Sequence, residues 1–153
     1  MSPGGLVSYY SLSFDASVRH QPKPMSIIRV DPADSAAAPR KAVEVLRGGG
    51  LLAFPTAEGY VVGCSALDAE AVKRLCAATG ASPDSLVSLA DSRDPMPLTL
   101  MRDADTPITA TPPRPGAPPV PTAQHVVFVL GDRLDLVLDA GPVRRELAGA
   151  AAR

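Results

Sequence analysis

The segment from Gly48 to Ala66, GGGLLAFPTAEGYVVGCSA, determines how the rest of the chain is interpreted. Its three glycines end a helical pattern, because glycine readily adopts the backbone conformation that terminates a helix. The apolar run Leu51–Phe54 predicts a buried strand, and Pro55 and Thr56 predict a turn after it. A second apolar run, Tyr60–Cys64, predicts another strand. The segment therefore predicts the order helix, strand, turn, strand.

The composition limits the class of protein. The chain has 153 residues, 46% of them hydrophobic, which suffices for one domain with one core. Only 4% are aromatic and 17 are proline, so we expect a core of Val, Leu and Ala and many loops. The 15 Lys and Arg and the 16 Asp and Glu give a net charge of -1, which provides no general attraction to nucleic acids or membranes.

Neither cysteine belongs to a metal-binding or disulfide pattern. Cys64 and Cys76 fall in different predicted elements, and we interpret both as small core residues in a reducing compartment. The N-terminus has neither the charged region nor the continuous apolar region of a signal peptide, and no apolar run is long enough to span a bilayer. We therefore expect a cytoplasmic protein with no membrane partner and no metal site of its own.

The first 24 residues differ from the rest of the chain. An alternating piece, Leu6–Phe14, is followed by a polar segment that contains prolines, so residues 1–24 are interpreted as a poorly ordered N-terminal extension. Met25 precedes the short apolar strand 27–30 and resembles an ordinary domain start. We predict one folded domain, residues 25–153.

Strands and helices alternate along this domain, which predicts an α/β fold with a parallel or mixed sheet. Asp68 and Thr122 are suitable N-caps, and Gly48, Gly80 and Gly131 are suitable helix ends. The β-branched run from Val126 to Val129 also allows a strand in place of the helix that begins near Thr122. The predicted helices are 35–48, 69–80, 122–131 and 143–152, and the predicted strands are 27–30, 51–54, 60–64, 85–90, 97–101, 107–111 and 134–138.

Several polar or unusual segments have two interpretations. Residues 112–121, PPRPGAPPVP, form an extended connecting loop or a ligand for a proline-recognising domain, and the loop is favoured. His20 and His125 are isolated, so neither suggests a catalytic group. The acidic residues near the C-terminus lack the spacing of a calcium loop, and we interpret them as solvated or capping. They are Asp132, Asp135 and Asp139.

The turn after the first strand of the opening segment is the best candidate for a binding site. It carries the hydroxyl of Thr56, the carboxylate of Glu58 and the phenol of Tyr60. In open α/β sheets, ligands bind beyond the carboxyl ends of the strands, and three such groups can hold a small polar substrate. The alternative is purely structural, with Thr56 bonded to turn backbone, Glu58 solvated and Tyr60 packed on its ring.

The order of these motifs resembles the YrdC-like family, whose best known members are threonylcarbamoyl-AMP synthases. The family has a helix, Gly-Gly, an apolar strand and Pro-Thr-Glu-Thr-x-Tyr-Gly-Leu-Gly, and residues 41–66, KAVEVLRGGGLLAFPTAEGYVVGCSA, match this order. The matched positions are the glycine pair, Pro55, Thr56, Tyr60, Gly63 and Ala66. The segments 97–100 (PLTL), 107–111 (PITAT) and 131–142 (GDRLDLVLDAGP) resemble the later family blocks in the correct order.

The resemblance implies a twisted mixed α/β sheet with flanking helices around a concave cavity. It also implies condensation of threonine, bicarbonate and ATP, with Mg²⁺, to threonylcarbamoyl-AMP and pyrophosphate, for the modification of an adenosine in tRNA. Substrate contacts are then expected at Thr56, Glu58 and Tyr60 and nucleotide contacts at Ser85, Thr111 and Arg114.

Some family positions are occupied by other residues. The family's Lys-x-Arg falls at Thr79-Gly80-Ala81, its Ser-Ala-Asn falls near Pro112-Pro113-Arg114, and its second threonine is Glu58, which would repel the carboxylate of threonine. The segment between Leu89 and Pro107 is shorter than in the family, so a central strand is expected to be missing. These differences support an alternative, a non-catalytic protein that binds a nucleotide or double-stranded RNA.

Overall fold

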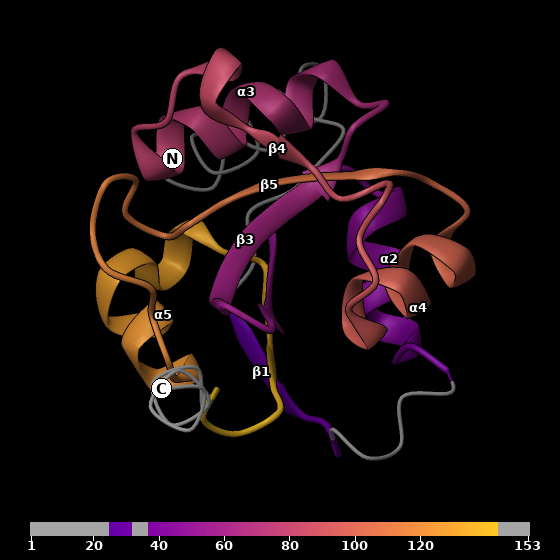
Figure 1. The fold of residues 1–153 in the computed structure, drawn as a ribbon. Helices are drawn as coiled ribbons and strands as arrows, with labels where there is room; N and C mark the ends of the chain where they lie inside the picture. The colour runs from indigo at the N-terminus through magenta and orange to yellow at the C-terminus, as the bar shows by residue number, and fades with distance from the viewer. Residues whose placement is uncertain (1–24, 32–36, 144–153) are drawn as a thin grey trace, which may run out of the picture.

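A computed structural model describes residues 25–31 and 37–143, and Figure 1 shows its elements. The predicted extension 1–24, the start of the first predicted helix and nearly all of the predicted terminal helix lie outside these residues. The strands are β1 (Ser26–Arg29), β2 (Leu52–Thr56), β3 (Gly59–Ser65), β4 (Val87–Ser88), β5 (Ile108–Thr111) and β6 (Leu136–Asp139). The helices are α2 (Arg40–Arg47), α3 (Ala69–Thr79), α4 (Pro95–Ala104) and α5 (Ala123–Leu130), with 3-10 turns η1 (Pro83–Ser85) and η2 (Gly131–Arg133).

The six strands form one mixed sheet in the order β1-β6-β2-β3-β5-β4, which confirms the predicted α/β class. Strand β6 is parallel to both β1 and β2, whereas β3 is antiparallel to β2 and β5, and β4 is antiparallel to β5. Consequently β1, β2, β5 and β6 all end at the same end of the sheet, and β3 and β4 begin there. We call this the carboxyl end of the sheet.

Helices cover the two faces of the sheet and divide the core in two. Helices α3 and α5 pack with one cluster and α2 and α4 with the other, so that α5 and the α2–α4 pair lie on opposite sides of the strands (Figure 1). The alternation of side chains along a strand explains the division. In β2, Leu52 and Phe54 join the α2–α4 cluster, while Ala53 joins the α3–α5 cluster.

The predicted turn at Pro55 and Thr56 is wrong by two residues, because both lie within β2. Pro55 pairs with Tyr60, whose backbone N–H donates to the carbonyl of Val120 and thus points away from β2. Proline has no N–H to donate, and at this non-hydrogen-bonded position the ladder with β3 does not need one. The hairpin turn is therefore Ala57–Glu58.

The predicted strand 97–101 is also wrong, because these residues belong to helix α4. Pro95 occupies the first turn of the helix, where its missing N–H costs nothing. The buried residues Met96, Leu100 and Ala104 are spaced four apart, which is the helical period. The five residues PLTLM fit a strand and a helix equally, and packing of α4 against α2 and β2 favours the helix.

The helix ends predicted at Asp68, Gly80 and Thr122 agree with the structure, whereas the helix predicted from residue 35 begins only at Arg40. The side chain of Asp68 accepts hydrogen bonds from the amides of Glu70 and Ala71, and α3 ends at Gly80, whose φ is 82°. The side chain of Thr122 caps α5, which excludes the strand alternative for this segment. The predicted strand 85–90 is reduced to Val87–Ser88. Ser85 belongs to η1, and only Val87 and Ser88 pair with β5.

Candidate ligand site at the carboxyl end of the sheet

The topology brings the predicted site residues to the carboxyl end of the sheet. Thr56 ends β2, Tyr60 lies at the start of β3, and Thr111 ends β5. Arg114 follows β5 by three residues. Ser85 lies just before Val87, which pairs with Ala110, so it also lies toward the Thr111 end of β5. Residues that are up to 58 positions apart in the sequence, from Thr56 to Arg114, thus share one end of the sheet.

The β2–β3 hairpin is closed by the side chain of Thr56. Its hydroxyl donates to the carbonyl of Gly59 at 2.8 Å and accepts from the amide of Glu58 at 3.2 Å. The amide of Ala57 donates to a carboxylate oxygen of Asp94, which ties the hairpin tip to the start of α4. Thr56 keeps one acceptor lone pair, and the side chain of Glu58 is exposed, so both can meet a ligand.

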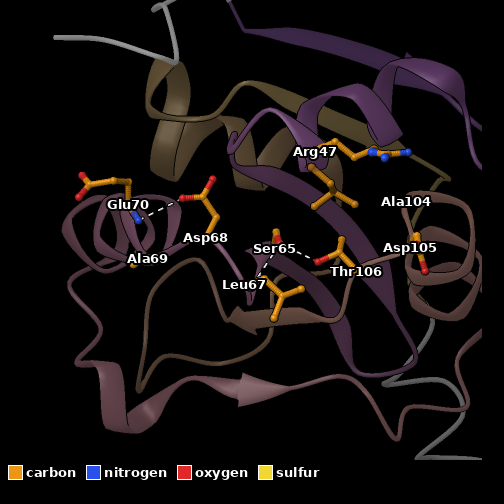
Figure 2. A pocket seen from close by; sticks show the side chains of 10 residues that line it. Arg47, Ser65, Leu67, Asp68, Ala69, Glu70, Ala104, Asp105 and Thr106 are labelled. Carbon is orange, nitrogen blue, oxygen red and sulfur yellow. Dashed lines mark hydrogen bonds between the residues drawn. The ribbon is translucent and has the colours of Figure 1, made fainter.

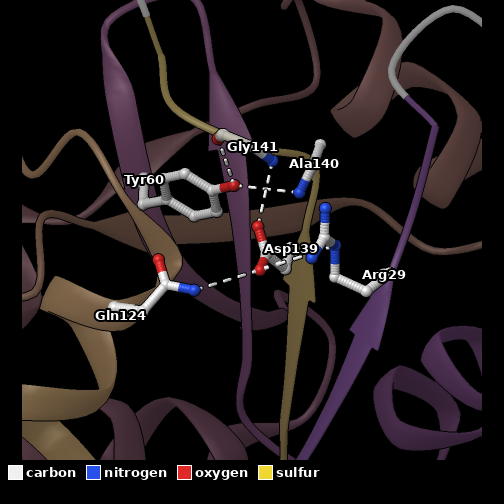
Figure 3. Close-up of polar contacts among 6 residues, drawn as sticks. All are labelled: Arg29, Tyr60, Gln124, Asp139, Ala140 and Gly141. Atoms are coloured by element: carbon white, nitrogen blue, oxygen red, sulfur yellow. Dashed lines mark hydrogen bonds and ion pairs between the residues drawn. The ribbon is translucent and has the colours of Figure 1, made fainter.

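Tyr60 connects the hairpin to two other segments, and Figure 3 shows its contacts with the segment that follows β6. Its ring is buried, its hydroxyl donates to the carbonyl of Gly141 at 2.7 Å, and the same oxygen accepts from the amide of Ala140 at 2.9 Å. Its own amide donates to the carbonyl of Val120 at 2.8 Å. Burial raises the pKa of Tyr60 above its ordinary value, and the nearby carboxylate of Asp139 acts in the same direction.

Asp139 was expected to be solvated or capping, and only the second expectation is right. One of its oxygens accepts from the amide of Gly141 at 2.9 Å, but the residue is only 4% exposed. Its other oxygen lies 3.4 Å from the amide nitrogen of Gln124 and 3.8 Å from Nε of Arg29 (Figure 3). The side chain of Arg29 is 82% exposed. The sequence reasoning missed Arg29 and Asp139, although both end parallel strands, which was the available signal.

The three residues predicted to contact a nucleotide lie in different environments. Thr111 is buried and pairs with Val62 of β3. Arg114 is exposed in the loop 112–121. Ser85 is exposed, and its hydroxyl donates to the carbonyl of Ser82 at 2.8 Å. Only Arg114 therefore offers an exposed charge to a phosphate among these three.

A pocket of about 450 Å³ lies at the opposite end of the sheet (Figure 2). The hydroxyls of Ser65 and Thr106 are hydrogen-bonded there at 2.7 Å, and Asp68 caps helix α3 beside them. None of the six predicted site residues lines this pocket. Its lining residues are Leu46, Arg47, Ser65, Leu67, Asp68, Ala69, Glu70, Ala104, Asp105 and Thr106. The pocket and the predicted site are thus separate places in the fold.

The positions that the resemblance aligns with Lys-x-Arg serve to end a helix. The hydroxyl of Thr79 donates to the carbonyl of Leu75 and accepts from the amide of Ala81, and Gly80 has the left-handed conformation typical of a helix end. Residues 25–31 and 37–143 contain no group of three or more His, Cys, Asp or Glu that could hold a metal ion. No helix in these residues is long and apolar enough to cross a membrane.

Known structures share this fold. The chain is similar to two structures of Sua5 of P. abyssi. The similarity to a doubly substituted variant has a TM-score of 0.63 and 21% identity over 78% of this chain. The similarity to a complex with L-threonine has a TM-score of 0.61 and 22% identity over 80% of this chain. It covers 54% and 52% of those two chains, about half of their length. It is also similar to E. coli YciO, with a TM-score of 0.57 and 17% identity over 79% of this chain and 85% of that one.

A further likeness is to full-length HypF in a phosphate- and nucleotide-bound form, with a TM-score of 0.54 and 18% identity. It extends over 67% of this chain and 24% of HypF. No family model matches the sequence. A search of curated proteins finds no match. The structural likenesses establish a fold of the Sua5 and YciO type, as the resemblance in the sequence predicted.

Proposed function

We propose that the chain binds threonine and ATP at the carboxyl end of its sheet and condenses them with bicarbonate to threonylcarbamoyl-AMP, with release of pyrophosphate and water. The observation that carries this proposal is the gathering of the predicted residues at that one end, in a fold of the Sua5 type. Sua5 of P. abyssi has been crystallised with L-threonine, and HypF with phosphate and a nucleotide. These likenesses support ligands of the same two kinds here.

Different residues of the chain are suited to bind the amino acid and the nucleotide. Thr56, with its free acceptor lone pair, would accept a hydrogen bond from the amino acid. The exposed carboxylate of Glu58 would repel the carboxylate of that ligand and so weaken its binding. Arg114 and Arg29 carry exposed guanidinium groups at the carboxyl end, and either can pair with a phosphate through two hydrogen bonds. Cations placed near the departing pyrophosphate would stabilise its charge.

Magnesium does not fit a site made by residues 25–31 and 37–143 alone. The part of the chain that the structure describes has no cluster of carboxylate or imidazole ligands, and the buried Asp139 already bonds to Gly141 and Gln124. Mg²⁺ commonly binds through phosphates and water with few protein ligands, so the nucleotide itself would bring the ion.

The test is the formation of threonylcarbamoyl-AMP and pyrophosphate by the purified chain, measured by mass spectrometry with threonine, bicarbonate and ATP. Omission of either threonine or bicarbonate should abolish both products. Arg114→Ala should reduce the rate by about tenfold or more, because a hydrogen bond to a charged group is worth about 1.5–3 kcal/mol. Arg102→Ala, on the exposed side of α4, is the matched control and should not change it. No product above background at high protein concentration would refute the enzymatic proposal.

A second candidate is nucleotide binding without catalysis. The observation that favours it is the helix end at Thr79-Gly80-Ala81, which offers no cation where the family resemblance expects two. Calorimetry with ATP, AMP and a tRNA distinguishes the candidates. Binding of ATP or AMP by a chain that forms no product supports the second candidate, binding of tRNA adds RNA as a partner, and binding of none of the three refutes it.

A further inference from the structure

We infer that Tyr60 is a positioning residue, which fixes the hairpin tip relative to the two other segments at the carboxyl end of the sheet. The sequence suggested a phenol that contacts the substrate. The contacts of Tyr60 instead favour a clamp that acts through the loops it joins.

Tyr60 makes hydrogen bonds through both its backbone amide and its side-chain hydroxyl. Its backbone amide donates to Val120 in the proline-rich loop 112–121, and its hydroxyl both donates to Gly141 and accepts from Ala140 in the segment that follows β6. All three distances lie between 2.7 and 2.9 Å, which are good hydrogen-bond lengths. One residue therefore joins three loops that are far apart in the sequence.

Burial makes the side chain of Tyr60 unsuited to direct contact with a ligand. The residue is 1% exposed, and its ring belongs to the core cluster that includes Val62, Val120 and Val137. The hydroxyl has one proton to donate, and Gly141 accepts it. A ligand would have to break this bond before Tyr60 could donate to it.

The segments that Tyr60 joins are the ones that carry the proposed binding groups. Thr56 is in the hairpin and Arg114 is in the proline-rich loop. The exposed guanidinium of Arg29 lies beside Asp139, which immediately precedes Ala140. Gly59 allows the hairpin to pack closely against the proline-rich loop, because a Cβ there would lie 3.1 Å from Cβ of Pro119 and from the carbonyl oxygen of Val120. A small displacement of one loop against another would change the spacing between these groups. This part of the inference rests on the proposed function.

The test is Tyr60→Phe, which keeps the ring and removes the two hydroxyl bonds. Hydrogen exchange of backbone amides, measured by NMR, should show exchange at Ala140 accelerated by roughly five- to tenfold, since one hydrogen bond contributes about 1 kcal/mol. Amide exchange at the β2–β3 pairs Ala53–Val62 and Leu52–Gly63 should accelerate only as much as the variant's loss of unfolding free energy requires. Unchanged exchange at Ala140 would overturn the clamp.

Ser65→Ala is a matched control, because it removes a buried hydroxyl from the other end of the same strand. Ser65 is 7% exposed and bonds to Thr106 at 2.7 Å. This variant should lose a similar amount of stability and leave exchange at Ala140 unchanged apart from that global loss. An equal acceleration at Ala140 in both variants would overturn the clamp, since a general loss of stability would then explain the effect.

Ligand binding supplies an independent second readout. If the natural chain binds threonine or ATP in calorimetry, Tyr60→Phe should weaken that binding by about fivefold or more, and Ser65→Ala should not. Equal binding by the natural chain and Tyr60→Phe would overturn the positioning of the ligand site. If the natural chain binds neither ligand, the proposed function fails, and exchange at Ala140 still decides whether Tyr60 holds the loops together.

Discussion

Helix α4 can be tested with two leucines that lie two residues apart. In the structure Leu100 is fully buried and Leu98 is 43% exposed, because positions two apart point to different sides of a helix. In a strand, the same two residues would lie on one face. Leu100→Ala should cost about 2–5 kcal/mol, the sum of lost burial and a residual cavity. Leu98→Ala should cost about 1 kcal/mol or less, since half of its surface is already in water.

Urea unfolding of the two variants measures this difference directly. For a chain of this size, the loss at Leu100 corresponds to a melting temperature lower by roughly 4–20 °C, and the loss at Leu98 to a few degrees at most. Equal dependence of the unfolding free energy on urea would show that both variants unfold from the same native fold. Similar losses at the two positions would place Leu98 and Leu100 on one buried face and refute the helix.

Four further predictions concern residues of β3 and the hairpin. Gly63→Ala should lower the unfolding free energy by about 1–3 kcal/mol in urea titrations, because a Cβ there would lie 2.9 Å from Cγ2 of Ile108; an unchanged midpoint would contradict this packing. Burial raises the pKa of Cys64 from 9.0 to about 12, so a thiol reagent at pH 8 should label Cys76 and spare Cys64. As the pH rises, the Cys64 thiol loses its proton near pH 9 in the unfolded chain but only near pH 12 in the folded protein. The contribution of this thiol to the unfolding free energy is therefore full below pH 9 and is lost between pH 9 and pH 12. Cys64→Ala should remove this part of the pH dependence of stability. Glu58→Gln should tighten threonine binding in calorimetry about fourfold, the effect of removing a like charge at ~5 Å in water; weaker binding would show that Glu58 attracts the ligand instead.

Local patterns predicted the parts of the fold that depend on neighbouring residues. Asp68, Gly80 and Thr122 were assigned as helix ends, and each has that role because a cap involves only residues three or four positions away. The five residues 97–101 were assigned wrongly because so short a run fits either period. Burial of Leu100 against the α2–α4 core decided between helix and strand, and that contact depends on distant parts of the chain.

The candidate site was predictable in part for the same reason. Thr56 and Glu58 lie in one short segment, so their proximity could be read from the sequence. Arg29 and Asp139 lie side by side only because β1 and β6 are parallel neighbours, and residue spacing does not reveal strand order. The sequence indicates a role for Tyr60, but not its partners, because Gly141 lies in the segment after β6 and Val120 lies in the proline-rich loop.

Ligand binding at the carboxyl end of the sheet can be mapped residue by residue. The isotopically labelled chain is titrated with threonine and with ATP while its backbone amide shifts are followed by NMR. Binding at this end predicts amide shifts at residues 56–60, at Thr111 and Arg114 and at residues 139–141, and none at the pocket residues 65–70 and 104–106. Shifts confined to that pocket, or no shifts with either ligand, would contradict it.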